Sequence, residues 1–167
     1  MFKEFLKKHI DYNKLCVNRV LRAAKIYKKG GLYKIIALFM HKKNRRKFNI
    51  EIYPQVDIGK IIIPHAVGIV IGKTASIGDG TVIMPNVVVG ARFSPTVENP
   101  KKRRHAIIGK NCILGANSVI IGDITIGNNV TIGAGAIVTK DVPDNSVVVG
   151  HNIVKVKSKN EVNYYDR

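Results

Sequence analysis

The sequence predicts an all-β solenoid that follows a short α-helical N-terminal region. Between Ile71 and Ile137 an aliphatic residue recurs every six positions, and Gly directly follows seven of the nine residues that set this repeat. Residues 1–49 lack the repeat and carry apolar residues at roughly helical spacing instead. The nine residues are Ile71, Ile77, Ile83, Val89, Ile108, Leu114, Ile120, Ile126 and Ile132.

A period of six fits neither an α-helix, with about 3.6 residues per turn, nor the two-residue alternation of a half-buried strand. It suits a strand of a few residues that ends in a tight turn, and three such units close one triangular coil. The aliphatic residue then points inward, and the small residue after it permits the corner. Asn and Asp tolerate turn geometry and stand nearby at Asp79, Asn86, Asn111, Asn117 and Asn128.

These patterns divide the chain into three parts. Residues 1–49 form a basic amphipathic helical region, residues 50–150 form the solenoid, and residues 151–167 form a C-terminal tail. Within the solenoid, residues 91–107 contain two prolines and a basic run, so we expect them to leave the strand rhythm as a loop.

The positive charge is concentrated in the helical region. The whole chain carries +17, and residues 1–50 hold fifteen Lys or Arg against Glu4 and Asp11. The apolar spacing, interrupted at Gly30 and Gly31, predicts two amphipathic helices. Such a pair can cap the open end of the solenoid or rest on an anionic membrane surface. Nucleic-acid binding is the weakest of three alternatives, because no aromatic stacking platform accompanies the charge.

Composition excludes several classes of protein. The 167 residues are 46% hydrophobic, which argues against disorder. Cys16 and Cys112 lie far apart without metal-ligand spacing, so we expect neither a disulfide framework nor a metal site, and Cys112 fits a buried position of the repeat. Neither a membrane span nor a signal peptide is indicated, so we expect a cytoplasmic protein, with peripheral contact at the inner membrane face as the alternative.

The repeat begins irregularly around His65, which follows Pro64 and precedes small residues. A lone His in a solenoid is more often a turn residue than a base. Neutral imidazole nevertheless takes a proton from an alcohol if a second group fixes its tautomer. Glu51 lies about one coil earlier, so we predict that Glu51 and His65 are stacked neighbours and form a dyad.

The repeat breaks at two further places. The loop 91–107 ends with Arg104 and His105, which places a cation and an imidazole at a fixed rim, although a solvated basic loop is the simpler alternative. The last regular unit runs into Thr139 and Lys140, and small residues at Ala116, Ala134 and Ala136 leave a smooth outer wall for a long thin ligand. Lys140 can contact the phosphates of such a ligand as a point charge.

Together these segments resemble the hexapeptide-repeat acyltransferases. The segment PHAVGIVIGK, residues 64–73, is similar to the DHATGIVIGE element of the serine O-acetyltransferase branch, which also contains O-acetyltransferases of capsule and exopolysaccharide synthesis. The resemblance places His65 on the catalytic His, and Glu51 of IEIYP on the Asp of the partner element IDIHP. It places Arg104 and His105 on the acceptor contacts, and Ala116, Ala134, Thr139 and Lys140 on the acetyl-CoA groove.

The resemblance implies a left-handed parallel β-helix and a homotrimer whose sites lie between subunits. It also implies direct transfer from acetyl-CoA, with His65 deprotonating an acceptor hydroxyl and no metal taking part. The segments that carry the resemblance lie within residues 50–150.

Three departures bear on the acceptor. Pro64 stands where the serine enzymes have an Asp that contacts serine, Glu51 is longer than the usual Asp, and the helical region is short. We therefore predict acetylation of a sugar hydroxyl in capsular or exopolysaccharide synthesis. The alternative is a serine O-acetyltransferase of cysteine biosynthesis, although the C-terminal NYYDR lacks the Ile expected for docking a sulfhydrylase.

Two alternative functions fit fewer of these observations. A non-catalytic basic solenoid that binds anionic surfaces accounts for the charge but not for His65 and the loop. A γ-type carbonic anhydrase requires three His around zinc, two of them closely spaced, and the solenoid offers only His65, His105 and the distant His151. We exclude the carbonic anhydrase.

Overall fold

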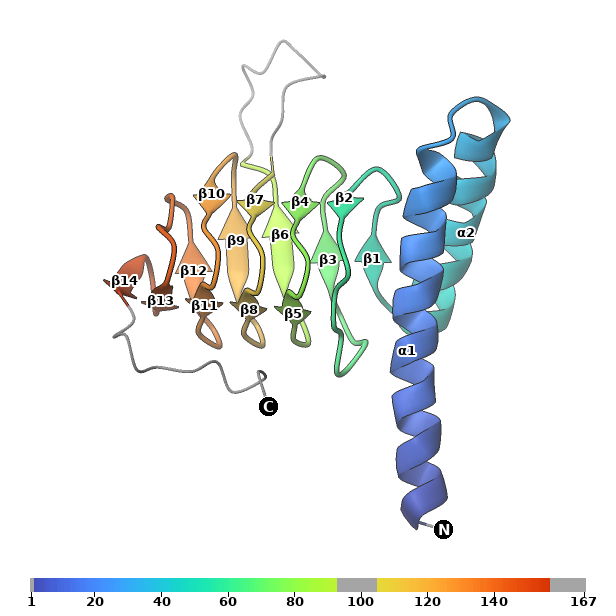
Figure 1. Ribbon diagram of the computed structural model, residues 1–167, viewed down its shortest axis with the longest axis horizontal. Helices are drawn as coiled ribbons and strands as arrows, with labels where there is room; N and C mark the ends of the chain where they lie inside the picture. Colours follow the sequence, from blue (N-terminus) through green and yellow to red (C-terminus); the bar gives the residue numbers. More distant parts are fainter. Residues whose placement is uncertain (1, 93–104, 157–167) are drawn as a thin grey trace.

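The computed structural model describes residues 2–92 and 105–156. Two helices, α1 (Phe2–Tyr27) and α2 (Leu32–Phe48), lie at one end of a solenoid of short strands (Figure 1). The strands are β1 (Glu51–Ile52), β2 (Asp57–Ile58), β3 (Val70–Ile71), β4 (Ser76–Ile77), β5 (Val82–Ile83), β6 (Val88–Gly90), β7 (Ile107–Ile108), β8 (Ile113–Leu114), β9 (Val119–Ile121), β10 (Thr125–Ile126), β11 (Thr131–Ile132), β12 (Ile137–Val138), β13 (Ser146–Val149) and β14 (Ile153–Val156).

The strands form three sheets, one on each face of a triangular prism. Sheet A has the order β1-β3-β6-β9-β12, sheet B the order β10-β7-β4-β2, and sheet C the order β14-β13-β11-β8-β5. Apart from the last pair of sheet C, neighbouring strands are parallel, as in the ladder Val70, Val88 and Val119 of sheet A. The predicted β-solenoid with a helical N-terminal region is therefore confirmed.

The repeat aliphatics fill the interior of the prism. Side chains that are almost wholly buried include Ile71, Ile77, Ile83, Ile108, Leu114, Ile120, Ile126 and Ile132. Cys112 is buried as well, as its position in the repeat predicts. Each strand contributes an inward aliphatic to one continuous stack, so burial of these side chains is the main force that holds successive coils together.

Two of the three corners are built from residues in the left-handed backbone conformation. The corner between sheets C and A carries Asn49, Gly68, Asn86, Asn117 and Gly135 in successive coils, and the corner between sheets B and C carries Gly80, Asn111, Asn129 and Asn145. Asn side chains extend these columns, because Asn86 Nδ2 donates to Asn117 Oδ1 at 3.1 Å and Asn129 Nδ2 to Asn145 Oδ1 at 2.8 Å. Asn and Gly tolerate this conformation better than other residues.

The third corner, between sheets A and B, is different. In its described residues only Gly122 has a positive φ, 104°. The predicted loop 91–107 falls between β6, which ends at Gly90, and β7, which already includes Ile107. Residues 93–104 lie outside the described part of the structure.

The two ends of the solenoid are covered differently. β14 pairs antiparallel with β13, with Val148 opposite Val154, so this hairpin ends sheet C. At the other end, α1 and α2 pack on the first coil and bury Cys16, Val20 and Phe48 with its core. Of α1 and α2, the helices that the structure describes, neither combines the length and apolar character needed to cross a membrane.

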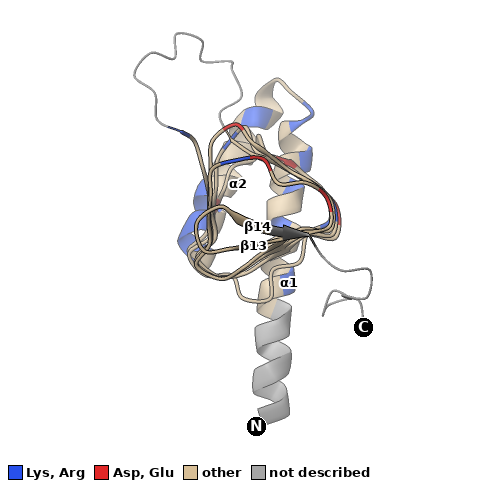
Figure 2. Ribbon diagram, turned by 90° about the vertical axis from the view of Figure 1, so that its left-hand side faces the viewer, with Lys and Arg blue, Asp and Glu red and all other residues tan. Residues whose placement is uncertain are grey.

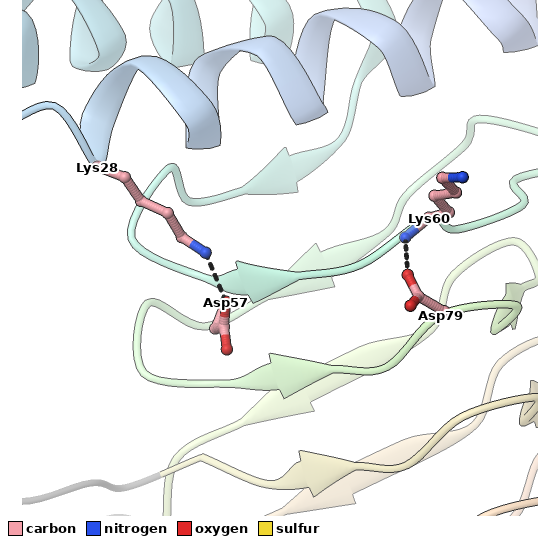
Figure 3. Close-up of polar contacts among 4 residues, drawn as sticks. All are labelled: Lys28, Asp57, Lys60 and Asp79. Atoms are coloured by element: carbon pink, nitrogen blue, oxygen red, sulfur yellow. Dashed lines mark hydrogen bonds and ion pairs between the residues drawn. The ribbon is translucent and has the colours of Figure 1, made fainter.

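Polar contacts tie α1 to the first coil and the first coil to the second. Lys28 Nζ lies 2.7 Å from Asp57 Oδ1, and the backbone amide of Lys60 donates to Asp79 Oδ1 at 2.7 Å (Figure 3). Both members of the Lys28–Asp57 pair are exposed, so we assign this ion pair less than about 1 kcal/mol.

Candidate active site

His65 lies in a bulge at the corner between sheets C and A. Ile62 bridges to Val82, and Val70 pairs with Val88, so the chain has two more residues between Ile62 and Val70 than between Val82 and Val88. The extra length lifts Pro64 and His65 out of the regular corner. A local break in the six-residue repeat thus marks the position of the predicted base.

Asn13 of α1 holds the backbone on both sides of His65. Its Nδ2 donates to the carbonyl of Pro64, and its Oδ1 accepts from the amide of Ala66 at 3.1 Å. Asn13 is only 7% exposed, so both hydrogen bonds are shielded from water. The sequence analysis missed Asn13, because nothing in the helical spacing of α1 points to a partner more than fifty residues later.

Glu51 begins β1, and its partner across the ladder is Val70 rather than His65. The prediction that Glu51 and His65 are stacked neighbours is therefore wrong, because a regular coil has 18 residues, as from Val70 to Val88, and His65 follows Glu51 by only 14. The Glu51 carboxylate lies 3.6 Å from Arg45 Nη1, which ties it to the end of α2. Hydrogen bonding to Glu51, followed by burial, raises the pKa of the Tyr53 hydroxyl.

His41 of α2 packs against the same strand. Its ring stacks on Tyr53 with centroids 4.8 Å apart, and its Nδ1 lies 3.0 Å from the carbonyl oxygen of Ile52. Burial lowers the pKa of His41, although the Ile52 carbonyl and Glu51 act in the opposite direction. Because a carbonyl oxygen only accepts, Nδ1 donates its proton to Ile52, and this hydrogen bond fixes the junction between α2 and β1.

His105 lies at the corner between sheets A and B, where the predicted loop rejoins the solenoid. Its Nδ1 is 2.6 Å from Thr74 Oγ1. Its ring lies against Gly72, where an added Cβ would overlap the imidazole. Thr74 and Gly72 are further residues that the sequence analysis did not single out, and Arg104, the predicted neighbour of His105, lies outside the described residues.

The positions predicted for the acetyl-CoA groove divide between the same two corners. Ala116 and Ala134 lie at the corner between sheets C and A, and Ala134 is exposed. Thr139 and Lys140 lie at the corner between sheets A and B. Asn152 fixes Thr139 twice: the Thr139 amide donates to Asn152 Oδ1, and Asn152 Nδ2 donates to Thr139 Oγ1, both at 2.8 Å.

One chain therefore places the predicted site residues in two groups on either side of sheet A. The first group is His65, Ala116 and Ala134, and the second is His105, Thr139 and Lys140. A ligand that contacts both groups must either cross the outer face of sheet A or lie between the first corner of one chain and the second corner of another.

A pocket of about 530 Å³ lies between α1 and the end of the first coil. It is lined by Asn13, Lys14, Val17, Asn18, Ile61, Ile62, Ile63 and Pro64. Its wall is mostly apolar, with two amides and one amine as polar groups, and Pro64 joins it directly to His65. Throughout residues 2–92 and 105–156, the structure shows no cluster of three or more His, Cys, Asp or Glu that could hold a metal ion.

Comparisons with known proteins agree with the coil geometry. Residues 105–140 match the family described as bacterial transferase hexapeptide (six repeats). The chain is 38% identical over 141 residues to serine acetyltransferase 2 of Arabidopsis thaliana, and 32% identical over 149 residues to a serine acetyltransferase of Bacillus pumilus. This chain belongs to the hexapeptide-repeat transferases. Within them, its relatives lie in the serine acetyltransferase branch.

Solved structures place this hexapeptide-repeat protein in the same branch. The serine acetyltransferase of Neisseria gonorrhoeae in complex with serine superposes with a TM-score of 0.74 at 31% identity, over 86% of this chain and 56% of that one. The matches to the plant and Bacillus enzymes cover 84% and 89% of this chain but 41% and 66% of the relatives. The chain thus spans less than two thirds of the length of these proteins.

Proposed function

We propose that this hexapeptide-repeat protein is an O-acetyltransferase that moves an acetyl group from acetyl-CoA to a hydroxyl, with L-serine as the first acceptor to test. The observation that carries the proposal is the position of His65. This residue lies in a bulge that borders a pocket, and Asn13 holds the backbone of the bulge. The relatives that share this fold are named serine acetyltransferases, which supports serine and acetyl-CoA.

The proposed reaction is a direct transfer. The neutral imidazole of His65 takes the proton of the acceptor hydroxyl, and the oxygen attacks the thioester carbonyl of acetyl-CoA. The carbon–sulfur bond then breaks, and the departing thiolate takes the proton from the imidazolium. A positioned base of this kind contributes about 10² to 10⁴ in rate, and holding the reactants together contributes much of the rest. The dyad of Glu51 and His65 stays a prediction, although the two residues are not partners across the ladder.

We further propose that the solenoid winds left-handed, as in its hexapeptide-repeat relatives, and assembles as a homotrimer. A threefold arrangement sets the corner of one subunit that carries His65 against the corner of the next that carries His105 and Lys140. The division of the site residues between two corners of one chain supports such shared sites. Ala116 and Ala134 then leave room for the cofactor, whose phosphates Lys140 contacts.

A sugar hydroxyl of a capsular or exopolysaccharide precursor is the second candidate acceptor. Pro64 favours it, because its uncharged side chain stands where the serine enzymes carry an acid. The pocket beside His65 points the same way, since its eight lining residues include Lys14 but no carboxylate to bind the ammonium group of serine.

The deciding experiment follows acetyl-CoA consumption as free thiol release, with L-serine in one series and a panel of sugars and oligosaccharides in another. Turnover with serine supports the first acceptor, and turnover with glycans alone supports the second. If neither series releases thiol, a direct measurement of acetyl-CoA binding decides whether the enzymatic proposal stands. Absence of binding would overturn it in favour of a basic surface-binding solenoid.

His65→Ala tests the base. We expect turnover to fall by at least about 10²-fold with acetyl-CoA binding retained, because the imidazole acts on the hydroxyl rather than on the cofactor. Lys140→Ala should instead raise the KM for acetyl-CoA, and Lys110→Ala, which removes another exposed lysine, should not. A His65→Ala protein with normal turnover would remove His65 as the base.

A further inference from the structure

The outer face of α2 is apolar although nothing in the described structure covers it. The buried residues of α2 are Ala37, Asn44 and Phe48, which define the face that packs on the protein. At about 100° per residue, Leu32, Ile35, Ile36 and Phe39 lie on the opposite face. Their exposed fractions are 72%, 61%, 44% and 75%.

The same outer face becomes basic toward the end of the helix. Lys42, Lys43 and Arg46 follow Phe39 on this side of α2, and all three are exposed. The whole helix carries Lys34, Lys42, Lys43, Arg45, Arg46 and Lys47 and has no Asp or Glu. Figure 2 shows Lys and Arg on α2 and on the coloured part of α1, whereas the Asp and Glu that it colours lie on the solenoid.

Contiguous exposed apolar side chains of this kind mark an interaction surface. Its partner must accept large apolar groups at one end and several cations at the other. A second copy facing it through the same surface would bring two strongly basic helices together, which electrostatic repulsion opposes. An anionic lipid surface offers both an apolar layer and negative headgroups, and this complementarity identifies the occupant.

We propose that the outer face of α2 docks on an anionic lipid bilayer, with Leu32, Ile35, Ile36 and Phe39 in the interface and Lys42, Lys43 and Arg46 on the headgroups. The two helices lie at one end of the solenoid (Figure 1), so the bilayer contacts the protein at that end. This inference does not depend on the proposed reaction.

The test measures binding of the full chain to vesicles by flotation. Vesicles of phosphatidylcholine alone are compared with vesicles that contain phosphatidylglycerol, at low and at high salt. We expect binding to the anionic vesicles only, weakening as salt rises. The double variants Ile35→Ser/Phe39→Ser and Lys42→Gln/Lys43→Gln should each weaken binding by about tenfold or more, since each cation and each buried apolar group contributes.

Matched controls change an apolar and a basic residue elsewhere. Ile153→Ser on β14, where Ile153 is 54% exposed, and Lys110→Gln on the solenoid should bind vesicles like the native chain. Equal loss of binding in these controls, or equal binding to neutral vesicles, overturns the proposal.

The same variants distinguish the bilayer from two other partners of this face, a second subunit and a nucleic acid. If Ile35→Ser/Phe39→Ser changes the oligomeric state in sedimentation and leaves vesicle binding intact, the face is a subunit contact and the proposal fails. If the chain binds duplex DNA more tightly than vesicles and that double variant has no effect on either, the surface acts through charge alone, which also overturns it.

Discussion

Thr74 and Gly72 position the imidazole ring of His105, and neither takes part in the proposed reaction. Thr74 contacts its Nδ1 at 2.6 Å, and Gly72 leaves the space that the ring occupies. The repeat predicts both a small residue at Gly72 and an irregular segment before His105. It does not predict their contact, because Thr74 and His105 lie 31 positions apart in the sequence.

Gly72→Ala should therefore act through His105. The new Cβ would overlap the imidazole ring, a side chain that can turn away, so we expect the ring to leave Thr74 and turnover to fall by about tenfold or more. Gly90→Ala is the matched control one coil further along the same corner, since among the described residues its Cβ would meet only the Val88 side chain, at 3.8 Å. Steady-state rates and melting temperatures of both variants distinguish displacement of the ring from unfolding.

Asn13→Ala should weaken both stability and turnover. It leaves the Pro64 carbonyl and the Ala66 amide without their buried partner, which lowers the free energy of unfolding by about 2–4 kcal/mol. Asn13→Asp keeps the acceptor for Ala66 but replaces the donor to Pro64. We expect kcat to fall in both variants, with the KM for acetyl-CoA unchanged.

The control for stability is Asn18→Ala on the same helix, where the side chain is exposed. Urea unfolding of the three variants compares their stabilities, and kcat is measured well below the unfolding midpoint of each. If Asn13→Asp turns over like the native enzyme, the donor to Pro64 has no part in positioning His65.

At the scale of elements, the repeat predicted more of the solenoid than of the helices. Six-residue spacing located the inward aliphatics, because each coil imposes the same demand on the same position. The repeat marked an irregularity at His65 but not its contacts with Asn13, since those depend on how the first coil meets α1. The sequence also does not show that the site residues divide between two corners, because this division appears only when the coils are stacked.

The left-handed residues at the corner between sheets C and A allow a prediction about stability. Asn117 has a φ of 59°, so Asn117→Ala should lower the free energy of unfolding by about 1–2 kcal/mol. Asn117→Gly should be milder, because Gly68 and Gly135 occupy equivalent places in the same column. Urea unfolding of both variants checks the order, and an Ala variant as stable as the Gly variant would contradict it.

Cys16, which is buried where α1 packs on the solenoid, should make the free energy of unfolding depend on pH. Burial raises the pKa of its thiol from 9.0 to about 12. Above pH 9 the unfolded chain loses this proton while the folded chain keeps it, so stability should fall as pH rises from 9 toward 12. Urea unfolding at pH 8 and pH 10 measures the fall, and Cys16→Ala should reduce it. Equal slopes for the two proteins would show that Cys16 does not contribute.

For the whole molecule, shared sites predict complementation between inactive variants. Neither His65→Ala nor His105→Ala alone should turn over at a normal rate. Subunits of the two variants, mixed after dissociation, should regain about a quarter of native activity, because one interface in four then combines both intact corners. Sedimentation checks that the mixture reassembles, and a reassembled mixture without activity would place each complete site within one chain.

A stack of identical coils contains no signal for where it should stop, and each outermost coil offers unpaired backbone amides and carbonyls to any further strand. β14 runs opposite to every other strand of sheet C, so a copy arriving with parallel strands finds the wrong hydrogen-bonding pattern there. The helices cover the opposite end. Reversal of a single strand thus closes sheet C to a further parallel copy and opposes end-to-end growth into fibres along that face.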